Sequence, residues 1–120
     1  MINKQDMISI PGIAPHMIAN NLEPYYPTHP GEVLKDEIEY RGISQKKLAV
    51  AMDVSYTLLN EVLNGKRPVN TELALLFEAT LDLPAEPLLK MQARYNILVT
   101  KRNGKFIEKL NKIRKLTAVF

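Results

Sequence analysis

Residues 44–64, SQKKLAVAMDVSYTLLNEVLN, have the pattern of two short helices joined by a tight turn. Ser44 and Ser55 each stand where a hydroxyl can accept a hydrogen bond from an unpaired amide at a helix start. Asp53, between the two segments, tolerates a left-handed backbone better than most residues and so favours a turn. Gly65 fits the position directly after the second helix. The stretch therefore predicts a pair of helices that decides the fold around it.

The two predicted helices divide into apolar and polar faces at helical spacing. The apolar positions are Leu48, Ala49, Met52, Leu58, Leu59, Val62 and Leu63. The polar face of the second helix holds Tyr56, Thr57, Asn60, Glu61 and Asn64. Hydroxyl and amide groups on an exposed helix can bond base edges in a DNA groove, and Asn can bond adenine with both amide atoms. We interpret the second helix as a DNA-recognition helix; the alternative is two ordinary helices of a small α-helical domain.

The spacing of the apolar residues in this stretch resembles the repressor-type helix-turn-helix pattern. The sequence departs from that pattern at Asp53, where the family usually has Gly. Beyond the second helix, Lys66 and Arg67 are placed to contact the DNA backbone, whose phosphates set register and affinity while base contacts set sequence. The alternative for these two residues is a plain basic surface turn.

The composition excludes several kinds of protein. The 120 residues allow one domain with a modest core and additional arms. There is no cysteine, which excludes a disulfide framework, a thiolate metal site and a cysteine nucleophile. No apolar run is long enough to cross a bilayer, and the N-terminus lacks the pattern of a signal peptide. We expect a cytoplasmic protein.

The positive charge is concentrated near the C-terminus. The net charge is only +3, but residues 90–120 hold nine basic residues and one acid, which gives +8. Such a segment can hold phosphates or an acidic partner; the alternative is a solvated, frayed end. Apolar residues from Phe106 to Leu116 recur at helical spacing and predict a basic amphipathic helix. That helix can dock on the domain, a second subunit or a protein partner, or lie at a membrane surface.

Three more helices are predicted around the central pair. Pro30 suits the first position of a helix that ends at Gly42. Asn70 caps a second helix, and a third runs over residues 85–99 before a break at Asn103–Gly104. The predicted apolar positions of these helices are Val33, Leu34, Ile38, Leu73, Leu76, Phe77, Leu81, Leu88, Leu89, Met91, Tyr95 and Leu98.

Residues 1–28 are expected to form an N-terminal arm, because four prolines interrupt any long helix there. The apolar group from Leu22 to Tyr26 favours contact with the domain or with a second subunit. The two histidines, His16 and His29, have no nearby carboxylate pattern. We expect them to cap or pack rather than bind a metal.

Four features in this order and spacing resemble a HigA-type antitoxin of a type II toxin–antitoxin system. They are HPGEVL at residues 29–34, SQKKLA at 44–49, LNGKR at 63–67, and the Gln92 and Tyr95 pair. The resemblance covers His29 to about Asn96. It implies an all-α fold with a five-helix repressor-like helix-turn-helix domain. We place that domain at residues 29–99, between the arm at 1–28 and a basic amphipathic extension at 100–120.

The resemblance also implies a dimer that binds an inverted-repeat operator and represses its own operon, and that neutralises a HigB-type toxin, an mRNA-cleaving ribonuclease. The family's DNA-contacting positions correspond here to Gln45, Ser55, Tyr56, Thr57, Asn60, Asn64, Lys66 and Arg67. Gln45 is expected to meet a phosphate, and Tyr56, Thr57 and Asn60 to meet base edges. Glu61 either accepts from a cytosine amino group or repels phosphates. Because two recognition helices about 34 Å apart read two half-sites, we predict a homodimer surface mainly on residues 85–99.

Other functions stay open at this point. A stand-alone helix-turn-helix transcriptional regulator without a toxin belongs to the same class, and a module that binds only protein belongs to a different one. An enzyme is the least supported, since the sequence has no phosphate-cradling glycine loop and no catalytic triad order. We expect no cofactor, no metal, no small-molecule substrate and no membrane partner. A toxin has two candidate sites between which the sequence does not decide, the Tyr25–Tyr26 arm and the Phe106–Leu116 helix.

Overall fold

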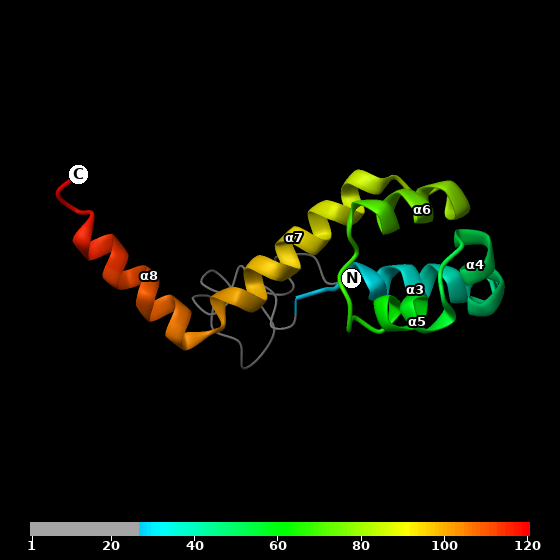
Figure 1. Ribbon diagram of the computed structural model, residues 1–120, viewed down its shortest axis with the longest axis horizontal. Helices are drawn as coiled ribbons and strands as arrows, with labels where there is room; N and C mark the ends of the chain where they lie inside the picture. Colours follow the sequence, from blue (N-terminus) through cyan, green and yellow to red (C-terminus); the bar gives the residue numbers. More distant parts are fainter. Residues whose placement is uncertain (1–26) are drawn as a thin grey trace, which may run out of the picture.

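The computed structural model describes residues 27–120, which form six helices and no strand. In chain order these are α3 Pro30–Arg41, α4 Gln45–Met52, α5 Tyr56–Leu63, α6 Thr71–Leu81, α7 Ala85–Lys101 and α8 Gly104–Leu116. Helices α3 to α6 gather at one end of the molecule, and α7 leads away from them to α8 (Figure 1). The predicted all-helical fold is confirmed. The predictions for His16 and for the Leu22–Tyr26 group lie outside the described residues.

The predicted helix boundaries around the central pair are confirmed. Ser44, Ser55 and Asn70 accept hydrogen bonds through their side chains from backbone amides at the starts of α4, α5 and α6. Asp53 has a φ of 54° and Gly65 a φ of 73°, both in the left-handed region. The turn after α4 therefore forms with Asp in the place that Gly usually takes, because a short polar side chain tolerates this conformation.

The core lies where α3 to α7 meet. Its buried apolar residues are Leu34, Ile38, Leu48, Ala49, Met52, Leu59, Val62, Leu63, Val69, Leu73, Ala74, Phe77, Leu81, Ala85 and Leu88. The prediction that Val33 belongs to the buried stripe of α3 is wrong, because its side chain is 40% exposed. Leu34 and Ile38 are one turn apart and face inward, whereas Val33 is turned about 100° away from Leu34.

The start of α3 packs closely against α5. The Nδ1 atom of His29 accepts a hydrogen bond of 2.8 Å from the Gly31 amide, which caps α3. The imidazole also meets the ring of Tyr95 edge-on, with centroids 4.9 Å apart. Burial lowers the pKa of His29, while the nearby Glu32 carboxylate opposes the shift. The prediction that His29 caps and packs is confirmed, and its contact with Tyr95 joins the start of α3 to α7.

The last two helices are joined by a short break. Helix α7 ends at Lys101, two residues beyond the predicted end, and Asn103 caps α8 by accepting from the Phe106 amide. Helix α8 has no buried residue. Among residues 27–120, no helix combines the length and the apolar character needed to traverse a bilayer.

Candidate nucleic-acid interface

Helix α5 presents a polar surface because its apolar residues face the other way. Leu59 and Val62 are fully buried against α3 and α4. Ser55 and Thr57 are exposed near the start of the helix, and the Tyr56 side chain is 46% exposed. The side chains predicted to meet base edges at the N-terminal end of α5 are therefore accessible from solvent.

A chain of side-chain hydrogen bonds crosses this surface from α4 through α5 to α3. Asn60 donates through Nδ2 to Gln45 Oε1 at 3.1 Å, and its own Oδ1 accepts from Asn64 Nδ2 at 3.2 Å. Asn64 Oδ1 in turn accepts from Lys35 Nζ at 3.1 Å. Asn60 is half-buried and bonded at both ends of its amide. It therefore holds the side chains of Gln45 and Asn64 in place.

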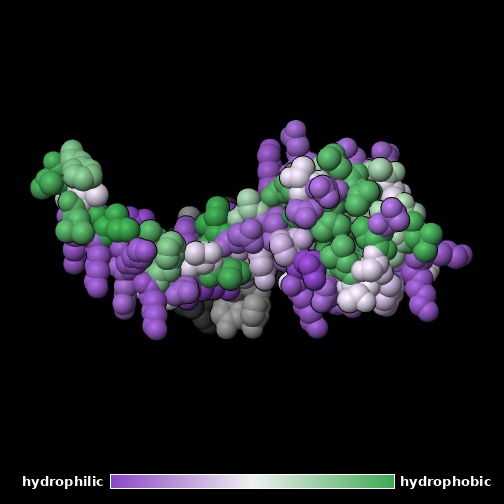
Figure 2. Space-filling model, in the orientation of Figure 1, coloured by the Kyte–Doolittle hydropathy of each residue, from purple (hydrophilic) through white to green (hydrophobic). Residues whose placement is uncertain are grey.

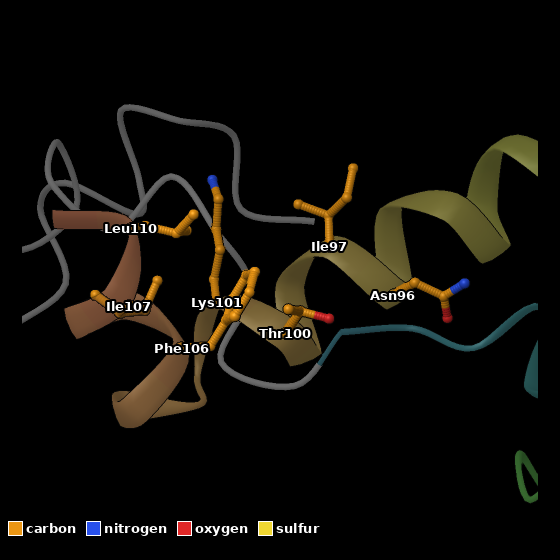
Figure 3. Close-up of a pocket in the computed structure, with 7 residues that line it drawn as sticks. All are labelled: Asn96, Ile97, Thr100, Lys101, Phe106, Ile107 and Leu110. Carbon is orange, nitrogen blue, oxygen red and sulfur yellow. The ribbon is translucent and has the colours of Figure 1, made fainter. Parts of the chain in front are cut away.

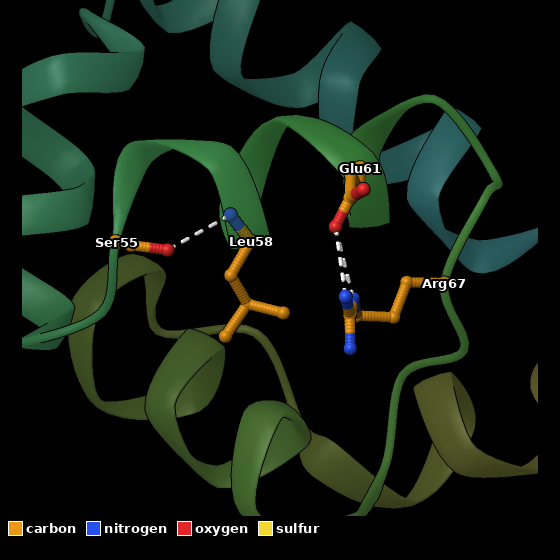
Figure 4. A network of polar contacts seen from close by, with 4 residues as sticks. All are labelled: Ser55, Leu58, Glu61 and Arg67. Carbon is orange, nitrogen blue, oxygen red and sulfur yellow. Dashed lines mark hydrogen bonds and ion pairs between the residues drawn. The ribbon is translucent and has the colours of Figure 1, made fainter.

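Arg67 is held by an acid on α5 (Figure 4). Its Nε and Nη2 atoms both donate to Glu61 Oε1, at 3.1 and 2.9 Å. The two side chains are 52% and 37% exposed, so the pair is open to solvent and to competing anions. The structure gives Glu61 a partner that the sequence analysis did not foresee, since the two residues lie on a helix and on the loop after it.

The helix ends at this surface are electrostatically distinct. A helix N-terminus carries a partial positive charge, which a nearby acid offsets. Helices α3, α6 and α7 each have an acid in the first turn, Glu32, Glu72 and Glu86 respectively. Helices α4 and α5 have none. The two helix starts that flank Gln45 and Tyr56 therefore keep a positive end that favours phosphate groups.

The structure brings together three of the predicted residues directly, Gln45, Asn60 and Asn64. Lys66 and Arg67 are exposed on the loop that follows α5. Sequence analysis gave Lys35 no role at the site, because it precedes Asn64 by 29 positions and no local spacing connects them. Within the described part of the chain, no group of three or more His, Cys, Asp or Glu side chains is placed to hold a metal ion.

Comparison with known proteins agrees with this geometry. The family described as Helix-turn-helix matches residues 34–88. A virulence-associated protein A' of Dichelobacter nodosus is 35% identical over 72 residues, and the match covers 59% of this chain and 63% of that protein. Pseudomonas aeruginosa antitoxin HigA, solved with the higBA promoter, has 32% identity and a TM-score of 0.63, with 69% of this chain and 92% of that one covered.

The chain belongs to the HigA family of helix-turn-helix proteins. A second structure, an addiction module antidote protein of a HigA family from Coxiella burnetii, has 31% identity and a TM-score of 0.62. That match covers 70% of this chain and 94% of the Coxiella chain. Since this HigA-family chain matches the solved structures over about 70% of its length, a substantial part of it lies beyond the region they share.

Proposed function

We propose that this chain is a sequence-specific DNA-binding antitoxin that represses its own toxin–antitoxin operon as a dimer and neutralises a HigB-type mRNA-cleaving toxin. The observation that carries the DNA-binding part is the accessible polar surface of α5. Its exposed residues Tyr56 and Thr57 lie beside an ordered amide chain that begins at Gln45. The HigA structure solved with the higBA promoter supports the same role.

The proposed contacts divide into two kinds. Tyr56, Thr57 and Asn60 meet base edges in the major groove, where hydroxyl and amide groups distinguish base pairs. Gln45, Ser55, Asn64, Lys66 and Arg67 surround them and meet the sugar–phosphate backbone, which fixes the register of α5. The positive N-terminal ends of α4 and α5 add attraction for phosphates without carrying sequence information.

A binding assay on the DNA upstream of the chain's own gene tests this proposal. We expect Thr57→Ala to lose roughly 1–3 kcal/mol of binding free energy on that DNA, or about 5- to 150-fold in affinity. Thr71→Ala, at the exposed first position of α6, is the matched control and is expected to bind like the wild type. Equal affinity of wild type and Thr57→Ala for upstream DNA and for an unrelated duplex would contradict the proposal.

Toxin binding and dimerisation need separate measurements. Co-expression with the product of the neighbouring gene, followed by co-purification, separates an antitoxin from a stand-alone transcriptional regulator. Two recognition helices about 34 Å apart are needed to read two half-sites, so we propose a dimer. We place its main surface on α7. Analytical ultracentrifugation gives the oligomeric state, and a gel shift gives the affinity for upstream DNA. A protein that stays monomeric and still binds upstream DNA in preference to an unrelated duplex would contradict the dimer.

A further inference from the structure

We propose that one face of α8 is a second DNA-binding surface, which contacts phosphates of the duplex outside the bases read by α5. This inference rests on the proposed function. The surface is the lysine stripe, defined as Lys105, Lys109, Lys112 and Lys115. Its partner is double-stranded DNA, recognised through backbone charge and without regard to base sequence.

The helix-turn-helix part has more acidic than basic residues. The domain at residues 29–99 contains eight basic and ten acidic residues, which gives a net charge of −2. Attraction to DNA that does not depend on sequence comes from cations that neutralise phosphates and release counterions. A domain with this charge lacks most of this attraction, whereas the extension at residues 100–120 has seven basic residues and one acid, which gives +6. The phosphate-binding charge of this chain is therefore held mainly outside the part that reads bases.

The lysine stripe has the geometry of a phosphate-binding surface. Its members recur every three or four residues and so lie along one side of α8. From Lys105 to Lys115 the helix rises about 15 Å, and duplex DNA presents a charge about every 1.7 Å along its axis, so several phosphates come within reach. All four lysines are exposed, and no ion pair joins them to any other residue from 27 to 120.

The packing of α8 turns this stripe outward. Phe106, Ile107 and Leu110 lie on the side of α8 that faces the end of α7, where they line a hollow of about 320 Å³ with Ile97 and Thr100 (Figure 3). Hydrophilic side chains accordingly gather along the lower side of α8 in Figure 2. Helix α5 lies at the lower edge of the domain in the same orientation (Figure 1). In this orientation the hydrophilic side of α8 and helix α5 both lie toward the lower side of the molecule.

The salt dependence of DNA binding tests this inference on the full-length protein. One variant replaces the four lysines with Gln, which keeps high helix propensity, and a matched variant replaces them with Arg, which keeps the charge. Fluorescence anisotropy compares both with wild type, using upstream DNA and an unrelated duplex of the same length. If each lysine neutralises one phosphate, raising salt from 50 to 200 mM weakens wild type about 150-fold more than the Gln variant.

The outcomes separate this inference from the proposed function. A Gln variant with a reduced salt dependence on both duplexes, together with an Arg variant that follows wild type, supports it. A Gln variant with the wild-type salt dependence overturns it, and leaves the proposed function standing if Thr57→Ala still loses affinity. The same result combined with loss of toxin co-purification also overturns it and assigns the stripe to an acidic protein surface. A wild type that binds neither duplex overturns both proposals.

Discussion

Glu61→Gln tests how the recognition helix meets the DNA backbone. The Glu61 carboxylate accepts two hydrogen bonds from Arg67, and the side chains of the pair are 37% and 52% exposed. An ion pair this exposed contributes roughly 0.2–1 kcal/mol. A phosphate that binds Arg67 has to compete with this carboxylate, so the pair opposes DNA binding by a free energy of about the same size.

We therefore expect Glu61→Gln to bind duplex DNA about 1.4- to 5-fold more tightly than wild type, from 0.2–1 kcal/mol converted to a ratio. The gain is expected to be equal for upstream DNA and for an unrelated duplex, because every duplex carries phosphates. Fluorescence anisotropy at low salt measures both. Glu39→Gln, at an exposed position of α3, is the control for a simple change in net charge.

A different result would refute this reasoning. If Glu61 accepts a hydrogen bond from a cytosine amino group, its loss weakens binding to upstream DNA by roughly 1–3 kcal/mol. Binding to unrelated duplexes is then unchanged. A tenfold or larger loss confined to upstream DNA would show that Glu61 reads a base, and that its bond to Arg67 orients it for that purpose.

Three further predictions concern the scaffold that holds this surface. Gly31→Ala is expected to destabilise the fold by about 1–3 kcal/mol in urea unfolding, because a Cβ there collides with the Val62 carbonyl oxygen. The control is Gly104→Ala, whose Cβ meets nothing within 4 Å, and we expect it to be neutral or slightly stabilising. Burial lowers the pKa of His29 below its ordinary 6.5, so the unfolded chain takes up the proton first. Above pH 6.5, His29 is therefore expected to leave the thermal midpoint unchanged. As the pH drops from 6.5 toward the lowered pKa, the midpoint is expected to fall. A midpoint that rises on acidification to about pH 5.5 would contradict this. Gln92→Ala removes the acceptor that lies 2.8 Å from the buried Val69 amide. We expect it to lower the free energy of unfolding by about 1–3 kcal/mol in the same assay. An unchanged free energy would show that water replaces the side chain as the acceptor.

The helix-turn-helix part was predictable from sequence because its signals are local. A cap such as Ser44 or Ser55 acts on an amide three residues away, and Asp53 acts on its own backbone. The apolar spacing gave the inward faces of α4 and α5. The prediction for Val33 was wrong because spacing within one helix is also only a local signal. Whether a residue beside a buried stripe is exposed depends on how the neighbouring helices pack.

The parts that sequence did not give depend on contacts between elements. Lys35 reaches Asn64 only because α3 packs across α5, and Gln92 on α7 bonds the Val69 amide 23 positions earlier. The bond from Asn60 to Gln45, 15 positions earlier, likewise depends on how α4 packs against α5. No periodicity in a single chain reports such long-range hydrogen bonds.

The two proposed DNA surfaces divide the work of binding between them. The helix-turn-helix part has a small net negative charge, so its phosphate contacts mainly fix the register of α5, and its preference comes from base contacts. A cationic helix attached through the break at Asn103 supplies attraction that every duplex can satisfy. Changes at Thr57 should then alter which sequence is bound, whereas changes in the lysine stripe should alter affinity on all sequences by the same factor. Attraction through the lysine stripe weakens as salt is added, whereas base contacts at α5 do not. As ionic strength rises, the affinities for the operator and for other DNA are therefore both expected to fall. The ratio of the two affinities is expected to stay nearly constant.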